Sequence, residues 1–364
     1  MGYETKLWLV VVFLLSATYM QCFCVVGVPE VPCLFIFGDS LSDPGNNNKL
    51  ATESKVNFLP YGIDFPDGPT GRFNNGRTSV DILTQTLGFE KFIPPFANTS
   101  GSDILQGVNY ASGSAGILKD SGQHMGVHVS FGSQIHNHKA ILSEITKKLG
   151  GPDQAQQHLN KCLYYVNIGN NDYLNNYFMP EHYPSSSKYS PDKYASVLIQ
   201  EYATHLKELH AVGARKFSLF GLGTIGCVPQ EILTHGKEGS PLCIEEETSA
   251  AFIFNQKLID LVDRFNDELP DSKFISVNAK VTITKDLKSL PSPGVFDSVC
   301  CKVGPLGLCD PKKEAETCRN RKEYLFFDAI HPTEMVNEVG AKNAYNSPYP
   351  NYAHPMDISH LVKL

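Results

Sequence analysis

Short apolar runs alternate with longer stretches of helical periodicity along most of this 364-residue chain. Five of the runs are four to six residues long and mostly β-branched or aromatic, which predicts strands. They are Leu34–Phe37, Val108–Ala111, Leu163–Ile168, Lys216–Phe220 and Phe274–Val277. This alternation is typical of a parallel sheet covered by helices on both faces, so the sequence predicts an α/β fold.

The two clearest helices repeat apolar residues three and four positions apart. The first is predicted to begin with Ser190 as N-cap and Pro191 at the first helical position, and to stop at Gly213. Its apolar stripe consists of Tyr194, Val197, Leu198, Leu206 and Leu209. The second carries Phe254, Leu258, Leu261, Val262, Phe265 and Leu269 ahead of Pro270. Both stripes are typical of helix faces that pack on a core.

The N-terminus has the order of a secretory signal peptide. Lys6 precedes the apolar run Leu7–Ala17, which is shorter than the roughly 20 residues that span a bilayer. A buried first helix or an amphipathic anchor is the alternative, and the lack of a polar face disfavours it. We therefore expect residues 1–27 to be removed, with the mature chain beginning between Val25 and Val28, secreted and extracellular.

Composition indicates a globular protein. Hydrophobic residues make up 42% of the chain and charged residues 19%. Two stretches, Tyr61–Arg77 and Pro291–Glu323, are irregular, but no linker, repeat or low-complexity segment marks a boundary. We expect residues 28–364 to form a single domain. The net charge of -7 and the absence of a Lys/Arg run argue against a nucleic-acid partner.

Cysteine usage supports the extracellular expectation. Of ten cysteines, Cys22 and Cys24 leave with the signal, so eight remain, an even number. Disulfides are expected in an oxidising compartment. Zinc bound by the Cys300–Cys318 cluster is the alternative, but adjacent cysteines match the usual ligand spacing poorly. The sequon at Asn98 is a candidate glycosylation site, and a chance occurrence is the alternative.

A candidate nucleophile follows the first strand. Leu34–Phe37 runs into Gly38-Asp39-Ser40, which places Ser40 where ligands bind in open α/β sheets. Ser is also a favoured helix N-cap, so Ser40 needs partners before a catalytic role follows. A serine hydroxyl requires a base such as His, itself oriented by a carboxylate. Asp328 and His331 offer that pair three residues apart, although such a spacing also occurs by chance.

Acyl transfer also needs hydrogen-bond donors for the oxyanion. Gly113 lies in a small-residue turn after Val108–Ala111, and Asn171 follows the strand Leu163–Ile168. The amides of Gly113 and Ser40 and the side chain of Asn171 are therefore candidate donors. Both segments are also what ordinary turns require.

Together these segments resemble the plant-type branch of the GDSL esterase/lipase family, within the SGNH hydrolases. The matching segments are Phe37-Gly38-Asp39-Ser40-Leu41-Ser42-Asp43 with Gly45-Asn46-Asn47, Gly107 through Leu118, Gly169-Asn170-Asn171-Asp172-Tyr173, and Asp328-Ala329-Ile330-His331-Pro332-Thr333-Glu334. The resemblance covers essentially the whole mature chain. It departs from the family at Ser114, Asn170 and Phe327, where Gly, Ser and Trp are usual.

The resemblance implies a three-layer α/β/α, flavodoxin-like SGNH hydrolase fold with a central five-stranded parallel sheet. It also implies a triad of Ser40, Asp328 and His331, with Ser40, Gly113 and Asn171 as oxyanion donors. The implied reaction proceeds through an acyl-enzyme and requires no cofactor or metal. Asp39 and Asp172, inside the matching segments, are interpreted as carboxylates that order loops.

The implied fold makes the first and third predicted strands neighbours. Cys33 precedes the first strand and Cys162 the third, so we expect these two to form a disulfide at the edge of the sheet away from the site. Cys227 and Cys243 are expected to close a loop. Cys300, Cys301, Cys309 and Cys318 would form two further disulfides whose pairing the sequence leaves open.

The partner implied is a small-molecule or lipid ester, and lipid, polyester, acetylated polysaccharide and phenolic esters all stay open. Tyr61, Phe65, Phe73 and Tyr173 are candidates to line an apolar groove, or to be core residues. Two other functions use the same fold. One is acyl transfer to an alcohol, and the other is a binding protein without activity.

Overall fold

The computed structural model describes residues 28–99, 101–236, 243–278 and 295–364, with the side chains of 101–103 and 295–297 left aside. The expected signal peptide, residues 1–27, lies outside the described residues. In the described part of the chain, no helix is both long and apolar enough to cross a membrane.

A five-stranded sheet of order β1-β2-β3-β4-β7 forms the centre of the fold. Its strands are β1 (Leu34–Gly38), β2 (Leu163–Asn167), β3 (Lys216–Phe220), β4 (Lys273–Val277) and β7 (Ala353–His354). The first four are parallel, and β7 pairs antiparallel with β4. Every residue of β1 is buried, as expected for a parallel strand covered on both faces. The α/β prediction is confirmed.

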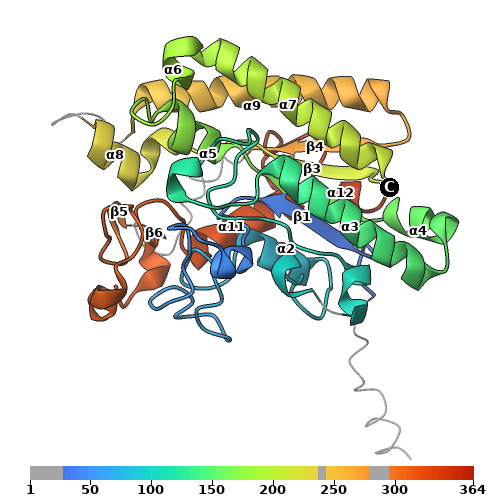
Figure 1. The fold of residues 1–364 in the computed structure, drawn as a ribbon, viewed down its shortest axis with the longest axis horizontal. Coiled ribbons are helices and arrows are strands. Elements are labelled where there is room, and N and C mark those ends of the chain that lie inside the picture. The colour runs from blue at the N-terminus through green and yellow to red at the C-terminus, as the bar shows by residue number, and fades with distance from the viewer. Residues whose placement is uncertain (1–27, 100, 237–242, 279–294) are drawn as a thin grey trace, which may run out of the picture.

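Helices cover both faces, which makes three layers (Figure 1). On one face lie α3 (Phe131–Leu149), α7 (Pro191–Ala211) and α9 (Glu245–Glu268), packed on Phe35, Phe37, Tyr164 and Phe217. On the other lie α2 (Ser79–Thr86), α11 (Glu334–Tyr345) and α12 (Ile358–Leu361), packed on Leu34, Ile36, Leu163 and Ile275. Alternate residues of each strand therefore serve opposite layers.

Shorter elements complete the described chain. They are α4 (Pro152–Leu159), α5 (Asn170–Asp172), a π-helical turn (Tyr173–Tyr177), α6 (Ser185–Lys188), α8 (Pro229–His235), β5 (Val295–Val299) and β6 (Tyr324–Phe326). β5 and β6 form a small parallel sheet of their own. Short 3-10 turns join several of these elements.

The two predicted helices are present with shifted ends. α7 has Ser190 as N-cap, whose hydroxyl accepts a hydrogen bond from the Lys193 amide at 3.3 Å, and it ends at Ala211. α9 begins at Glu245, well before the predicted stripe. Three glutamates occupy its first turn, where the helix dipole favours carboxylates. The start of α9 is therefore marked in the sequence by acidic residues and not by apolar ones.

The fifth strand differs from the prediction. Val108–Ala111 runs beside β1, where the Ile36 amide donates to the Val108 carbonyl at 3.0 Å, but it forms only an isolated parallel bridge at Asn109. The Gly38 amide, which would bond this segment next, donates to Gln134 Oε1 at 3.0 Å and interrupts the ladder. The fifth strand is instead β7, antiparallel and only two residues long, too short for a sequence signal.

Four disulfides join the eight cysteines of the described chain. The predicted pairs Cys33–Cys162 and Cys227–Cys243 are both present. The first follows from strand register, because Leu34 faces Leu163 across the pair of β1 and β2. The remaining cysteines pair as Cys300–Cys318 and Cys301–Cys309, which resolves the open pairing.

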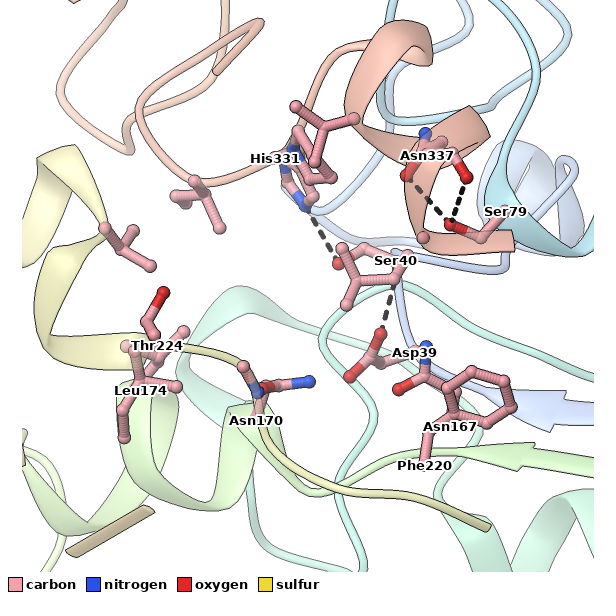
Figure 2. Close-up of a pocket in the computed structure, with 18 of the residues that line it drawn as sticks. Asp39, Ser40, Ser79, Asn167, Asn170, Leu174, Phe220, Thr224, His331 and Asn337 are labelled. Atoms are coloured by element: carbon pink, nitrogen blue, oxygen red, sulfur yellow. Dashed lines mark hydrogen bonds between the residues drawn. The ribbon is translucent and has the colours of Figure 1, made fainter. Parts of the chain in front are cut away.

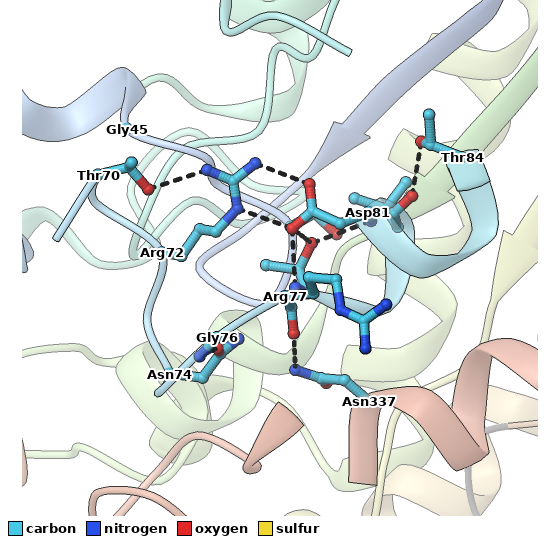
Figure 3. Close-up of polar contacts among 12 residues, drawn as sticks. Gly45, Thr70, Arg72, Asn74, Gly76, Arg77, Asp81, Thr84 and Asn337 are labelled. Carbon is cyan, nitrogen blue, oxygen red and sulfur yellow. Dashed lines mark hydrogen bonds and ion pairs between the residues drawn. The ribbon is translucent and has the colours of Figure 1, made fainter. Parts of the chain in front are cut away.

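The irregular stretch Tyr61–Arg77 is held by a buried ion pair (Figure 3). The Arg72 guanidinium donates to both carboxylate oxygens of Asp81 at 2.7 Å and to Thr70 at 2.9 Å. Asp81 also forms a capping box with Thr78 at the start of α2. One carboxylate thus begins a helix and anchors the loop before it.

Candidate active site

The predicted site residues meet at the carboxyl end of the sheet. Ser40 follows β1, Asn171 follows β2, and His331 lies in the loop after β6. The parallel strands β1 and β2 direct their carboxyl ends to one edge of the central sheet, so Ser40 and Asn171 converge there, while the loop after β6 in the small second sheet brings His331 to the same place. Ser40 and His331 are both mostly buried, and Asp328 is fully buried.

Three side chains form one chain of hydrogen bonds. His331 Nε2 lies 2.9 Å from Ser40 Oγ, a contact drawn in Figure 2. On the other side of the ring, His331 Nδ1 lies 2.8 Å from Asp328 Oδ2 and 3.0 Å from Oδ1. The imidazole therefore stands between a hydroxyl and a carboxylate, the arrangement that lets a histidine take the proton of a serine.

The Asp328 carboxylate is itself held on all sides. Its Oδ1 accepts the amides of Ile330 and His331 at 2.8 and 2.7 Å. The Tyr61 hydroxyl donates to Oδ2 at 2.6 Å and accepts the Cys309 amide at 2.9 Å. Burial, and then the charge of Asp328, raise the pKa of Tyr61 well above its ordinary value, so this hydroxyl stays a donor.

The contact of Tyr61 with Asp328 was not predicted from the sequence, where Tyr61 is a candidate groove or core residue. Tyr61 and Tyr173 are fully buried, and Phe65 and Phe73 nearly so, so all four belong to the interior. Phe73 nevertheless packs on the His331 ring, with 4.9 Å between centroids. The only local feature of the sequence that pointed to Tyr61 was its position between Pro60 and Gly62.

The predicted oxyanion donors differ in their availability. Asn171 Nδ2 donates to the Ala115 carbonyl at 3.0 Å, which occupies one of its two N–H groups. The Gly113 amide donates to Asp43 Oδ2 at 2.9 Å, so its hydrogen is bonded within the protein in this structure. No described residue accepts from the amide of Ser114, the next residue, which lines a cavity together with Ser40 and His331.

The backbone conformation of Ser114 shows why glycine is usual at this position in the family. Its φ of 60° is the left-handed conformation that glycine adopts most easily, and it is the only non-glycine residue with positive φ in the described chain. The Gly113 position is closed to larger residues, because a Cβ there would lie 2.6 Å from both Phe73 and Ser54. Asp43, which holds the turn, also accepts the amides of Gly45 and Asn46.

Asp39 and Asp172 order loops, as interpreted from sequence. Asp39 Oδ1 accepts the Leu41 amide at 3.0 Å, and burial raises the pKa of its carboxyl to about 6. Asp172 accepts the amides of Ile117 and Leu118 at 2.7 and 2.9 Å. Burial raises the pKa of Asp172 to about 7. Asp172 thereby ties the turn after Val108–Ala111 to the helix after β2.

Two cavities open at Ser40 and His331. The first, about 180 Å³, is shown in Figure 2 and lies between the ends of β2 and β3 and helix α11. The second, about 310 Å³, lies toward α8 and the turn that follows Ser114. An ester carbonyl at Ser40 thus has space on two sides, one for each half of an ester.

Two groups of described residues bring three potential metal ligands together. One contains Cys33 and Cys162, which are joined as a disulfide and offer no thiolate. The other comprises Glu231, His235 and Glu247, where His235 Nδ1 lies 2.9 Å from Glu247 and 3.3 Å from Glu231. Burial raises the pKa of both carboxyls, and the His235 imidazole contacts both.

Comparison with known proteins gives a consistent result. A family model described as GDSL-like lipase/acylhydrolase matches residues 34–344. A GDSL esterase/lipase of Arabidopsis thaliana is 44% identical over 360 residues, covering 97% of this chain and 99% of the relative. A second from the same plant is 45% identical over 342 residues, covering 92% and 93% of the two chains. A third is 44% identical over 367 residues, covering 95% and 100%.

Proposed function

This chain belongs to the GDSL-like lipase/acylhydrolase family, and from that premise we propose that Ser40, His331 and Asp328 are its catalytic triad. It is a carboxylic ester hydrolase of that family. The observation that carries the triad is the continuous set of contacts from Ser40 Oγ through His331 to Asp328, at 2.9 and 2.8 Å.

In the proposed mechanism His331 Nε2 takes the Ser40 proton as Oγ attacks the ester carbonyl. The tetrahedral intermediate then collapses, its C–O bond to the alcohol breaks, and His331 returns the proton to the leaving oxygen. A water molecule, deprotonated by His331, then attacks the acyl-enzyme, the bond between the acyl carbon and Ser40 Oγ breaks, and His331 returns the proton to Oγ as the acid leaves. Asp328 remains ionised and stabilises the imidazolium formed in each half-reaction.

The developing oxyanion is proposed to receive hydrogen bonds from the Ser40 amide and from the free N–H of Asn171. Because the Gly113 amide is bonded to Asp43, the third donor that we propose is the Ser114 amide in place of Gly113. The lining of the second cavity, which includes Ser40, Ser114 and Asn171, supports this choice. Removing one such donor typically reduces turnover about 100- to 1000-fold.

The first test is hydrolysis of p-nitrophenyl esters by the secreted wild type and by Ser40→Ala. Loss of the hydroxyl removes covalent catalysis, so we expect kcat to fall by at least about 1000-fold while the unfolding midpoint stays within a few degrees. A Ser40→Ala variant that kept most of the activity would refute the role of Ser40 and with it the triad.

Acyl transfer uses the same acyl-enzyme, with an alcohol in place of water. The second cavity beside Ser40 gives an acceptor alcohol a place to bind, which is the observation that favours this activity. Product analysis with an added alcohol separates the two, because transfer yields a new ester and hydrolysis only the free acid. The inactive binding-protein function is disfavoured by the close Ser40–His331 contact.

We further propose that residues 1–27 are a signal peptide and that residues 28–364 form one secreted domain. The four disulfides support an oxidising compartment. Asn98, proposed to carry a glycan, is exposed in a short turn after Pro95. Treatment of the secreted protein with an N-glycosidase, compared with Asn98→Gln, tests that modification by the change in mass.

A further inference from the structure

The two cavities at Ser40 differ in the chemistry of their walls. The wall of the first is formed mainly by apolar side chains on the π-helical turn after β2, on β3 and the turn that follows it, on α11 and in the loop beside His331. These are Leu174, Phe220, Ile225, Val228, Ile330 and Val336. Figure 2 shows Leu174, Phe220 and Thr224 around the space that Ser40 and His331 border.

The polar groups of this first cavity are largely bonded to one another. Ser79 Oγ bonds Asn337 Oδ1 at 3.1 Å, and Asn167 Nδ2 donates to the Tyr165 hydroxyl at 3.2 Å. Among the described residues, the exceptions are Asp39 Oδ2, the second N–H of Asn171 and the Thr224 hydroxyl, and Asp39 stands beside Ser40 at the reacting end. A chain without polar groups therefore fits the remaining wall at no loss of hydrogen bonds.

The volume of the first cavity sets a length. At about 30 Å³ for each water-sized group, 180 Å³ holds roughly six groups of that size. A hexanoyl or octanoyl chain is of this order, an acetyl group leaves most of the space empty, and a palmitoyl chain exceeds it. Because each buried methylene contributes about 0.8 kcal/mol, filling this space changes the rate strongly.

The second cavity shares Leu174, Val228 and Ile330 with the first, but it adds polar and ionisable side chains that do not line the first. They include His124, Glu181, His182, Gln230, Glu231 and Thr234. Glu181 and His182 are exposed, so they can bond a ligand without first losing buried partners. A hydroxyl can donate to the Glu181 carboxylate and bond the His182 imidazole, whereas an alkyl alcohol offers no partner to either side chain.

We infer that the substrate is an ester of a medium-length aliphatic acid with a polyhydroxylated alcohol, the acyl chain lying in the first cavity and the alcohol in the second. This inference rests on the proposed catalytic role of Ser40, which both cavities border. It disfavours acetylated polysaccharides on the acyl side and wax-type esters on the alcohol side.

The acyl half is tested with p-nitrophenyl esters of two to sixteen carbons. We expect kcat/KM to rise up to about fourfold per methylene as far as six to eight carbons, and then to level off or fall. Val336→Phe narrows the cavity and should lower the ratio of octanoate to acetate kcat/KM at least tenfold. Val127→Phe, the same change at an exposed position outside both cavities, should leave that ratio unchanged.

The alcohol half is tested by comparing 1-octanoylglycerol with octyl octanoate, which share the acyl group. We expect at least a tenfold preference for the glycerol ester, reduced by Glu181→Gln. Equal rates, or a preference for the octyl ester, would overturn the alcohol assignment.

An optimum at acetate or palmitate, or equal effects of the two Phe substitutions, would overturn the acyl assignment. Inactivity toward every ester would refute the proposed function itself, an outcome separate from an altered length profile.

Discussion

At the scale of single residues, the orientation of the base depends on a side chain from a distant loop. Tyr61 donates to Asp328 across 267 positions of sequence and is in turn held by the Cys309 amide. Asp328 thus receives donors from its own loop and from the irregular segment that contains Tyr61, and a second irregular segment holds Tyr61. Tyr61 touches no substrate in this arrangement and acts as a positioning residue for Asp328.

Replacing Tyr61 by Phe should lower kcat about 10- to 100-fold with little change in KM, because a hydrogen bond to a charged group contributes about 1.5–3 kcal/mol. Steady-state kinetics measure this split. Tyr202→Phe is the matched control, since Tyr202 is fully buried and its hydroxyl has no partner among the described residues. A change in KM without a fall in kcat, or equal effects of the two substitutions, would contradict the positioning role.

Asp172 gives a prediction for pH at the same scale. Burial raises the pKa of its carboxyl from 3.8 to about 7, so between these values the folded state retains a proton that the unfolded state has released. The free energy of unfolding contributed by Asp172 therefore falls as pH rises from about 4 to 7, by at most about 1.4 kcal/mol per pH unit.

Urea unfolding from pH 4 to 8 measures this contribution against Asp172→Asn. The stability of wild type relative to this variant should be greatest at the acid end and should decline toward pH 7. Asp153→Asn, at an exposed position on α4, should run parallel to wild type. Parallel curves for Asp172→Asn would show that this carboxyl titrates normally.

At the scale of elements, the loop before α2 is organised by one carboxylate. Asp81 pairs with Arg72, whose guanidinium also lies 4.2 Å from the Phe65 ring centroid, and both charged side chains are nearly fully buried. The same loop carries Tyr61 to Asp328. The stability of this loop and the alignment of the site are therefore linked.

Arg72→Met should lower the free energy of unfolding by about 3–5 kcal/mol, because it leaves the Asp81 charge buried without its partner. Denaturant unfolding measures the loss. Arg77→Met removes a partner of Glu334 at a pair that is 32% and 21% exposed, and it should cost clearly less. Similar losses for the two variants would show that burial of the Arg72 pair is not the deciding factor.

At the scale of the whole molecule, one disulfide lies at the central sheet and another lies beside the residues that hold the candidate active site. Cys33–Cys162 joins residues 129 positions apart at the edge of β1 and β2 away from Ser40. Cys301–Cys309 joins residues only eight apart, and the Cys309 amide holds Tyr61. The two bonds should therefore contribute to different properties.

Replacing both cysteines of one pair by Ser should separate these properties. Loss of Cys33–Cys162 should cost about 5 kcal/mol of stability and loss of Cys301–Cys309 about 2.5 kcal/mol, from loop-closure entropy. Turnover of the folded enzyme should fall more for the second pair. Denaturant unfolding and kcat, measured on both variants, test this opposite order of effects. A lower kcat on loss of the first pair than on loss of the second would refute the prediction.

Much of the frame followed from sequence because it depends on neighbouring residues. Four strands, the N-cap at Ser190 and the Cys33–Cys162 pair were predicted from local patterns and strand order. β7 was missed because two residues carry no pattern, and Val108–Ala111 fell short of a strand because the Gly38 amide of β1 bonds the Gln134 side chain instead. Ser40, Asp328 and His331 were recognised by motif and chemistry.

By itself, then, the sequence determined the family, the α/β layers and the residues proposed to react, since each is encoded in short segments. Tertiary structure alone decided that Tyr61 bonds Asp328, that the Gly113 amide belongs to Asp43, and that two cavities of unlike wall chemistry meet at Ser40. The reason is physical. A hydrogen bond or a cavity wall joins side chains hundreds of positions apart, and no spacing along the chain records which of them come within 3 Å.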